Sequence, residues 1–583
     1  MTTKRLSRAL RSVAILAAVC IATWIVSYLL DFPSIGIDDA NIFLVYARNI
    51  SAGEGFVFNA GGERVEGFTS LLWVLICSAV LILTNNPERW LLGLNVLLVS
   101  LTIGCCLRSF VFRRSSADPT ISPSWAAAFL MLLLTDYRYV AWSTVALMET
   151  ALWTSLVTLS ALLIVDERND RGKRAGLAAL VGLMLLTRPE ALMWAPAVLM
   201  LVMVMRAPCE GYSASLRLTR PAVLVFVFGT GLLTMFRLVY FGFPLPNTYY
   251  AKVSPSLVFR LREGGTYLWL YISSGPIPFA GAVAIVISTL HLIIVGARDI
   301  RTMVLCALAG VGLLIPALTG GDHFGGFRFY QPVYPVLLLA LLNCVRFVLP
   351  RYAVLAAQWK FRRGWVLVGG ATLTAIFLAV QIVDWVQFEQ RLSMRMEFEI
   401  AQKGRERGSV AERLFADLRP RPSIGTITVG GLKHAYNGDV IDLMGLNNIR
   451  MAHNGGDRIG LRSHAAFEKR VFYEQKPTAV LPLVSYPDGL SCLQLRSPFV
   501  DLVLKGLLDD AAFHTAYRLA EVRRPTPEGF VALAAWYDRE FLTRLAHREG
   551  FEIVTAQPRS EGLFTDCGLG SPPQSSTSGN PGR

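Results

Sequence analysis

Long apolar stretches recur along the first two thirds of the chain and are separated by short polar loops. The first, from Ser12 to Leu30, has no charged residue over 19 positions, enough for a helix to cross a hydrocarbon core of about 30 Å. This stretch is longer than the apolar core of a signal peptide, and no small-x-small cleavage site follows it, so we expect a helix that is retained in the mature protein. Eleven stretches predict membrane spans near residues 12–30, 90–111, 123–135, 145–165, 175–187, 190–205, 221–240, 277–296, 303–318, 331–345 and 364–384.

A further apolar stretch at residues 69–83 is short, and whether it crosses decides the orientation of everything after it. If it does not cross, the loops on the side of the N-terminus hold 20 Lys and Arg in 70 residues, and the opposite short loops hold 9 in 121. Basic residues favour the cytoplasmic side, so this asymmetry predicts a juxtamembrane or re-entrant helix at 69–83. We therefore expect a bacterial inner (plasma) membrane protein with a cytoplasmic N-terminus and an extracytoplasmic first loop at 31–89.

The last 200 residues have a different pattern, with frequent charges and short β-like runs between helical patterns. The runs "SIGTITVG" (423–430), "DVIDLMG" (439–445) and "TAVLPLV" (478–484) predict strands, so residues 386–570 are expected to form an extracytoplasmic α/β domain after the membrane domain 1–385. The tail 571–583 is of low complexity and is expected to be disordered.

Composition agrees with a helical polytopic membrane protein: 53% of the 583 residues are hydrophobic and 17% are charged, against about 25% charged in ordinary soluble domains. The formal net charge is +14, and the basic residues lie in short loops between apolar runs, as in a membrane protein that holds its orientation. This argues against nucleic acid as a partner. The nine cysteines are scattered without a C-x-x-C or His-spaced cluster, so neither a disulfide scaffold nor a zinc site is indicated.

The polar motifs fall on one side of this predicted topology. They are "DDANIFLVYARNISAGEGFVFNAGGERVEGFTS" in the first loop, "TDYRYVAWSTVALMET", "TRPE" (187–190), "RLVYFGFPLPNTYYAK" (237–252) and "GGDHFGGFRFY" (320–330). Five loops thus offer carboxylates, cations, amides and tyrosines to one membrane face. Such convergence suits transfer of a sugar from a polyprenyl phosphate in the outer leaflet, which needs a carboxylate near the anomeric carbon, cations for the phosphate and an apolar groove.

Asp38 and Asp39 are the expected catalytic pair. On a helix they are about 100° apart, so they should have different roles: one as general base or stabiliser of positive charge, the other as a positioning group. Arg188, Lys252 and Arg328 are candidates for the donor phosphate. Structural readings remain open, because the Asp pair could cap a helix, Arg188 and Glu190 could neutralise each other in a turn, and Asn247 could form an Asx turn.

The first-loop motif resembles that of a bacterial group of GT-C glycosyltransferases that includes the actinobacterial terminal β-(1→2)-arabinofuranosyltransferase of cell-wall arabinan. The likeness continues through "ALMETAL", "LTRPEAL", "YFGFPLPNTYYAK", "GGDHFGGFRFYQP" and "VIDLMGLNN". It implies a GT-C fold, a polyprenyl-phosphate-linked donor, with D-arabinofuranose as the expected sugar, and transfer on the extracytoplasmic face to a glycan. It also implies that Asp38 and Asp39 are catalytic.

The remaining site candidates come from loop placement. Those expected near the donor are Glu190, Asn247, Tyr250, Asp322 and His323, with Glu66 and Glu149 as further candidates. No cofactor is certain, but a divalent metal is possible if Asp38, Asp39, Asp322 and His323 meet. The alternatives are a protein acceptor such as pilin, another polyprenyl-phosphate sugar, and a transporter or flippase of lipid-linked sugars, although the charges lie at span ends and no repeat is visible.

Overall fold

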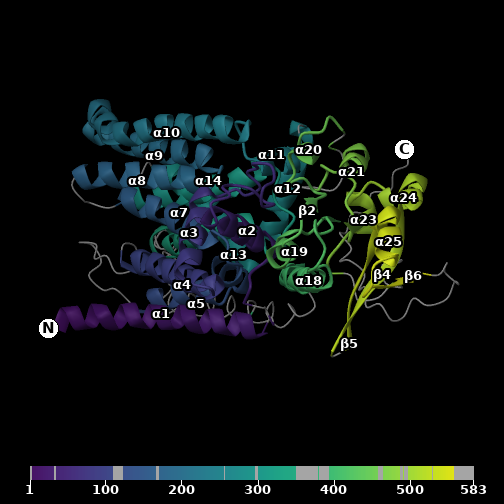
Figure 1. Cartoon of the computed structure of the whole chain (residues 1–583). Coiled ribbons are helices and arrows are strands. Elements are labelled where there is room, and N and C mark those ends of the chain that lie inside the picture. Colours follow the sequence, from purple (N-terminus) through teal and green to yellow (C-terminus); the bar gives the residue numbers. More distant parts are fainter. Residues whose placement is uncertain are drawn as a thin grey trace, which may run out of the picture.

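The computed structural model consists of a helical part and a smaller α/β part that lie side by side (Figure 1). It describes residues 3–29, 31, 34–108, 123–165, 170–254, 256–295, 300–349, 379, 393–456, 458, 464–485, 490, 497–527 and 529–556. The predicted span 364–384 and the tail 571–583 therefore lie outside the described residues, apart from position 379.

The helical part contains both long apolar helices and short helices that carry the polar loops. Its elements are α1 (Thr3–Leu29), α2 (Asp38–Ser51), α3 (Leu71–Leu83), α4 (Pro87–Cys106), α5 (Pro123–Leu134), α6 (Tyr137–Val140), the π-helix η2 (Ala141–Val145), α7 (Thr150–Val165), α8 (Asp170–Thr187), α9 (Ala191–Glu210), α10 (Tyr212–Phe241), α11 (Asn247–Lys252), α12 (Leu257–Ser273), α13 (Pro276–Val295), α14 (Ile300–Thr319), the 3-10 helix η3 (Arg328–Val333), α15 (Tyr334–Asn343) and the π-helix η4 (Cys344–Val348).

Within the described residues, six helical segments are long and apolar enough to cross a membrane. They are Leu10–Tyr28, Pro87–Cys106, Tyr212–Phe241, Pro276–Ile294, Arg301–Thr319 and Arg328–Val348. The chain is thus a multi-pass membrane protein, while the count of eleven spans stays a prediction. The stretch predicted as a re-entrant helix forms α3, whose 13 residues are shorter than a spanning helix.

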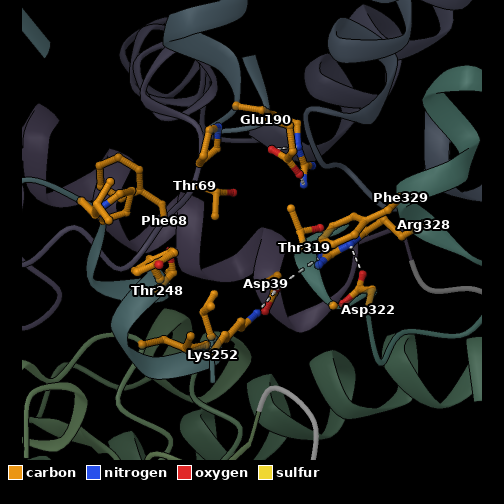
Figure 2. A pocket seen from close by; sticks show the side chains of 18 of the residues that line it. Asp39, Phe68, Thr69, Glu190, Thr248, Lys252, Thr319, Asp322, Arg328 and Phe329 are labelled. Atoms are coloured by element: carbon orange, nitrogen blue, oxygen red, sulfur yellow. Dashed lines mark hydrogen bonds and ion pairs between the residues drawn. The ribbon is translucent and has the colours of Figure 1, made fainter. Parts of the chain in front are cut away.

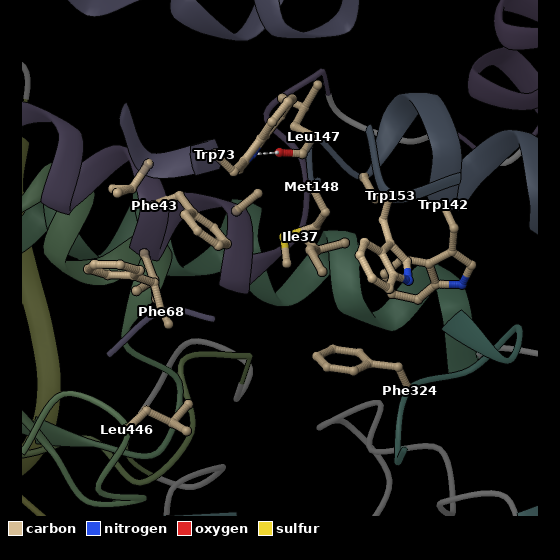
Figure 3. Close-up of a cluster of buried hydrophobic side chains, with 14 of the residues drawn as sticks. Ile37, Phe43, Phe68, Trp73, Trp142, Leu147, Met148, Trp153, Phe324 and Leu446 are labelled. Carbon is tan, nitrogen blue, oxygen red and sulfur yellow. Dashed lines mark hydrogen bonds between the residues drawn. The ribbon is translucent and has the colours of Figure 1, made fainter. Parts of the chain in front are cut away.

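The expected span at 145–165 is not one straight helix. The segments Tyr137–Val145 and Thr150–Val165 are bent by 111° at the turn between them. Leu147 in this turn has a φ of 57°, a left-handed conformation that non-glycine residues rarely adopt. The Trp73 indole donates a hydrogen bond of 3.2 Å to the Leu147 carbonyl, and both side chains belong to the buried cluster in Figure 3. Packing therefore holds the bend, which directs the following residue pair, Met148 and Glu149, towards the polar loops.

The α/β part is built on a six-stranded sheet with the strand order β2-β1-β3-β5-β4-β6. Strand β1 pairs in parallel with β2 and β3, and the pairs β3–β5, β5–β4 and β4–β6 are antiparallel. Its elements are α18 (Ser393–Leu414), β1 (Ile424–Thr426), α19 (Gly430–Ala435), β2 (Val440–Asp442), α20 (Ile449–Ala452), α21 (Lys469–Gln475), β3 (Ala479–Val480), α23 (Pro498–Val503), the 3-10 helix η5 (Leu507–Asp509), α24 (Ala511–Ala516), β4 (Tyr517–Thr526), β5 (Gly529–Asp538), α25 (Arg539–Ala546) and β6 (Glu552–Thr555). Strands β1, β2 and β3 lie in the three runs that predicted strands.

The first loop joins the two parts. Asn59 exchanges two hydrogen bonds of 3.0 Å with the backbone of Val440 at the edge of the sheet. The Tyr46 hydroxyl donates to Asn447 at 3.0 Å, and Arg405 of α18 donates to Asn41 of α2 at 2.7 Å. Helix α2 is consequently enclosed between the helical part and the α18–α19 pair, and its N-terminus faces the polar loops.

Candidate active site

A cavity of about 420 Å³ lies where the polar loops of the helical part converge (Figure 2). One part of its wall is charged and carries Asp39, Glu149, Arg188, Glu190, Lys252, Asp322 and Arg328, all predicted from the sequence. The rest is mainly apolar, with Ile42, Phe43, Phe68, Met148, Leu192, Met193, Leu245, Val253 and Phe259. An amphipathic ligand, charged at one end and apolar at the other, matches this lining.

Asp38 and Asp39 begin α2 and face different partners, in keeping with their angular separation on a helix. Both oxygens of Asp38 accept backbone N–H groups of α19, from Gly430 at 3.0 Å and Gly431 at 2.8 Å. Burial is the main cause that raises the pKa of Asp38 to about 6, although these N–H groups oppose it. Of the pair, only Asp39 lines the cavity, with 21% of its side chain exposed.

Two cations face Asp39 in the cavity. Its Oδ2 atom lies 3.3 Å from Arg328 Nη1 and 3.9 Å from Lys252 Nζ (Figure 2). Burial would raise the pKa of Asp39, but the positive charges of Lys252 and Arg328 outweigh it and lower that pKa. Asp39 is therefore ionised at neutral pH and open to a ligand.

The glycine-rich loop before η3 orients Arg328. Phe327 and Gly326 both have positive φ values, 53° and 70°, and the Gly325 carbonyl accepts from the Trp142 indole at 3.0 Å. Arg328 Nε donates to Asp322 at 2.8 Å, and this guanidinium keeps the pKa of Asp322 below its usual range even though burial opposes the shift. Arg328 thus joins two carboxylates while only 7% of its side chain is exposed.

Arg188 forms a second group of buried ion pairs, in addition to that of Arg328. It donates two hydrogen bonds to Glu190, at 2.9 and 3.1 Å, and one of 2.7 Å to Glu149. The Glu149 side chain is fully buried and that of Arg188 is 7% exposed. The turn reading of "TRPE" was right about the Arg188–Glu190 pair. Glu149 forms part of the cavity wall and is held there by Arg188.

Four predicted candidates lie beside the cavity and do not line it. Glu66 forms a two-bond ion pair with Arg237 at 2.8 and 2.9 Å, and Asn247 donates to the carbonyls of Gly445 and Leu446. Tyr250 packs against His453 at 4.2 Å between ring centroids. His323 follows Asp322, and burial lowers its pKa, which favours the neutral ring. These contacts join the loops to one another and to the α/β part.

Three ionisable residues at the site were absent from the sequence-based predictions: Glu263, which lines the cavity, and two others, Arg260 and Glu397. Arg260 lines the cavity from the first turn of α12. Glu397 of α18 has a pKa raised to about 8, by burial first and then by the negative charges of Asp39 and Asp38. No motif flanks either residue, so only a count of charges at helix ends predicted to be extracytoplasmic could have pointed to Arg260.

The described residues contain no group of three or more His, Cys, Asp and Glu side chains placed to hold a metal ion. Of the four residues that the sequence suggested for this purpose, Asp39 and Asp322 are joined by Arg328, and Asp38 is bound by backbone N–H groups. The possible divalent metal remains a prediction.

Fold and site define a multi-pass helical membrane protein with a small sheet domain and an amphipathic cavity at its polar loops. No known protein-family model matches the chain. A terminal β-(1→2)-arabinofuranosyltransferase of Corynebacterium glutamicum is 27% identical over 337 residues, which are 52% of this chain and 47% of that protein. The match spans about half the length of this curated relative. It confirms the resemblance to GT-C glycosyltransferases that the loop motifs predicted.

Solved structures of similar arrangement are also known. ArnT from Cupriavidus metallidurans in the apo state is 14% identical, with 74% of this chain and 86% of that chain covered and a TM-score of 0.43. The same protein bound to undecaprenyl phosphate is 13% identical, with 74% and 85% covered and a TM-score of 0.41. An oligosaccharyltransferase from Archaeoglobus fulgidus, in complex with Zn and sulfate, is 12% identical, with 92% and 74% covered and a TM-score of 0.45.

Proposed function

We propose that this protein is a glycosyltransferase that moves a sugar, D-arabinofuranose in the first instance, from a polyprenyl-phosphate donor to a glycan outside the cytoplasm. The observation that carries the proposal is the cavity, in which an ionised Asp39 and its cations share one space with a mainly apolar wall. A polyprenyl-phosphate sugar has the same division between a charged head and an apolar tail. The arabinofuranosyltransferase relative supports arabinose as the sugar.

Asp39 is the proposed catalytic residue. Its carboxylate takes the proton of an acceptor hydroxyl while the hydroxyl oxygen bonds to the anomeric carbon. The bond from that carbon to the phosphate oxygen breaks, and its electron pair leaves with the phosphate. The negative charge of Asp39 also favours positive charge on the sugar ring in the transition state. Lys252 and Arg328 hold the carboxylate in its ionised form and in place.

Asp38 is proposed as a positioning residue. Both of its oxygens accept backbone N–H groups, from Gly430 and Gly431, and Asp38 does not line the cavity. It fixes the N-terminus of α2 against α19 and thereby sets the direction in which Asp39 enters the cavity. This division keeps the two different roles expected of the pair, whereas the family resemblance implied that both aspartates are catalytic.

The distribution of basic loops supports a cavity that opens on the extracytoplasmic side, with the α/β part there as well. In that orientation the donor head reaches Asp39 from the outer leaflet while its tail stays in lipid. The first loop and α18 would then border the space where a glycan acceptor approaches.

The test is transfer by the purified full-length protein in detergent. Polyprenyl-phospho-arabinofuranose and polyprenyl-phospho-mannose are offered in parallel, with an arabinan oligosaccharide as acceptor. Elongation of the oligosaccharide from the arabinose donor alone is the expected result. Elongation from mannose alone would overturn the sugar assignment. Binding of neither donor would overturn the proposed function.

A further inference from the structure

The charges that line the cavity do not favour an anion as they stand. Four cationic side chains, Arg188, Lys252, Arg260 and Arg328, face five acidic ones, Asp39, Glu149, Glu190, Glu263 and Asp322. A phosphate adds negative charge to this set. Its binding therefore requires a cation whose charge is not already compensated by a carboxylate.

Arg188 and Arg328 are poor candidates for that role. Arg188 makes three hydrogen bonds to two glutamates, and Arg328 bridges two aspartates; each side chain is 7% exposed. A phosphate beside either guanidinium would compete with the carboxylates that already compensate its charge.

Lys252 is partly compensated. Its ammonium lies 3.9 Å from Asp39 and 5.9 Å from the centre of the Phe324 ring. The position suits a group that supports the proposed catalytic carboxylate, and it leaves Lys252 able to give only part of its charge to a ligand.

Arg260 differs from the other three cations. It lies in the first turn of α12, is partly exposed and lines the cavity. Among the residues that the structure describes, its Nε atom is buried without a hydrogen-bond partner, and its guanidinium forms no ion pair. A buried N–H donor without a partner is costly, and an incoming acceptor would satisfy it.

The backbone at Gly320, which lies next to Arg260, leaves room for a ligand group. Gly320 has a φ of 100°, and the nearest side-chain atom to a Cβ added there would be Arg260 Cγ, at 3.7 Å. A glycine at this position is required by the backbone and keeps the wall beside Arg260 free of a side chain. Phe259 and Val253 continue the lining from the same region with apolar surface.

We propose that Arg260 binds the phosphate of the lipid-linked donor. The guanidinium offers a planar pair of N–H donors that matches two phosphate oxygens, and the adjacent apolar wall receives the start of the polyprenyl chain. This inference rests on the proposed function, because it names the residue that holds the donor of the same site. It assigns to Arg260 the role first expected of Arg188, Lys252 and Arg328.

The test measures lipid binding to the full-length protein by native mass spectrometry. The probes are undecaprenyl phosphate, undecaprenol and inorganic phosphate. R260A is expected to weaken undecaprenyl phosphate binding by about 10- to 100-fold and to leave undecaprenol binding unchanged. R260K should lie between wild type and R260A, because it keeps the charge and loses the planar pair of donors.

Arg262 provides a matched control, since it lies on the same helix, is exposed and does not line the cavity. R262A should bind undecaprenyl phosphate as wild type does. Equal losses of undecaprenol and undecaprenyl phosphate in R260A would overturn the proposal in favour of a structural role. Inorganic phosphate that binds wild type as tightly as the lipid would overturn the lipid assignment.

The outcomes also separate this inference from the proposed function. If wild type transfers sugar and R260A binds the phosphate lipid normally, Arg260 is excluded and the glycosyltransferase proposal stands. If wild type does not bind the phosphate lipid at all, both the proposed function and the role of Arg260 fail.

Discussion

The carboxylate of Asp38 accepts a hydrogen bond of 2.8 Å from the backbone N–H of Gly431, a residue 393 positions further along the chain. This bond and its companion from Gly430 connect the first turn of α2 to the α/β part. The neighbouring Asp39 instead enters the cavity between Lys252 and Arg328. Of these two adjacent carboxylates, Asp38 thus contacts the α/β part and Asp39 is open to a ligand.

A methyl group at position 430 should disrupt this contact. A Cβ on Gly430 would collide with the backbone carbonyl of Asp38, which leaves no flexible atom to yield. We expect G430A to lower the stability of the folded protein by about 1–3 kcal/mol, read from thermal unfolding in detergent. G455A is the control, because nothing lies within 4 Å of a Cβ at that exposed position. Equal melting temperatures of G430A and wild type would contradict the tight approach.

The Asp38 contact should depend on pH in a defined direction. The pKa of Asp38 is raised from 3.8 to about 6 in the folded state, so folding favours its protonated form. The stability gained from the raised pKa of Asp38 is fully present below pH 4, where the carboxyl group is protonated, and is lost as the pH rises to about 6. The melting temperature of wild type should therefore fall over this window more than that of D38N, which cannot ionise there. Parallel curves for the two proteins would exclude the shift.

Replacing Asp39 should remove transfer and leave binding. In D39N the general base and the negative charge are lost, and we expect kcat to fall by about 100- to 10,000-fold. Undecaprenyl phosphate should bind D39N at least as well as wild type, because one negative charge leaves the cavity. Substantial transfer by D39N, measured by elongation of the acceptor oligosaccharide, would place the catalytic carboxylate elsewhere.

Arg188 should matter chiefly for stability. R188A would leave the fully buried Glu149 without its ion-pair partner, at a cost of about 3–5 kcal/mol. The double variant R188A/E149A should recover part of that loss, because the uncompensated charge is gone. Thermal unfolding of the two variants decides the matter: a stable R188A with weakened lipid binding would restore the role in phosphate binding first expected from the sequence.

Glu397 should make donor use sensitive to alkaline pH. Its pKa is raised to about 8, so it is mainly neutral at pH 7 and gains a negative charge as the pH passes 8. That charge lies close enough to Asp39 and Asp38 to interact with both, and it disfavours an anionic donor. The KM for the donor should rise above pH 8 in wild type and stay flat in E397Q. The same rise in both proteins would assign it to another group.

Local pattern predicted several elements well. The strands β1, β2 and β3 lie within the three apolar runs that predicted them, and α3 is as short as its apolar stretch. The sharp bend before α7 was not predicted, although "TDYRYVAWSTVALMET" was expected to join two spans. The left-handed turn at Leu147 depends on Trp73, a partner distant in sequence, and no local pattern reports such a contact.

The sequence by itself determined that the chain is a multi-pass membrane protein and which loops carry its ionisable groups, because hydropathy and charge act on each segment separately. Only the tertiary structure decided what each charge does. Arg188, Arg260 and Arg328 are the same residue type in similar loops and helix ends. Of the three, only Arg188 and Arg328 have a buried side chain with a carboxylate within about 3 Å. Electrostatic energy depends on distances between residues far apart in the chain, and those distances exist only in the folded protein.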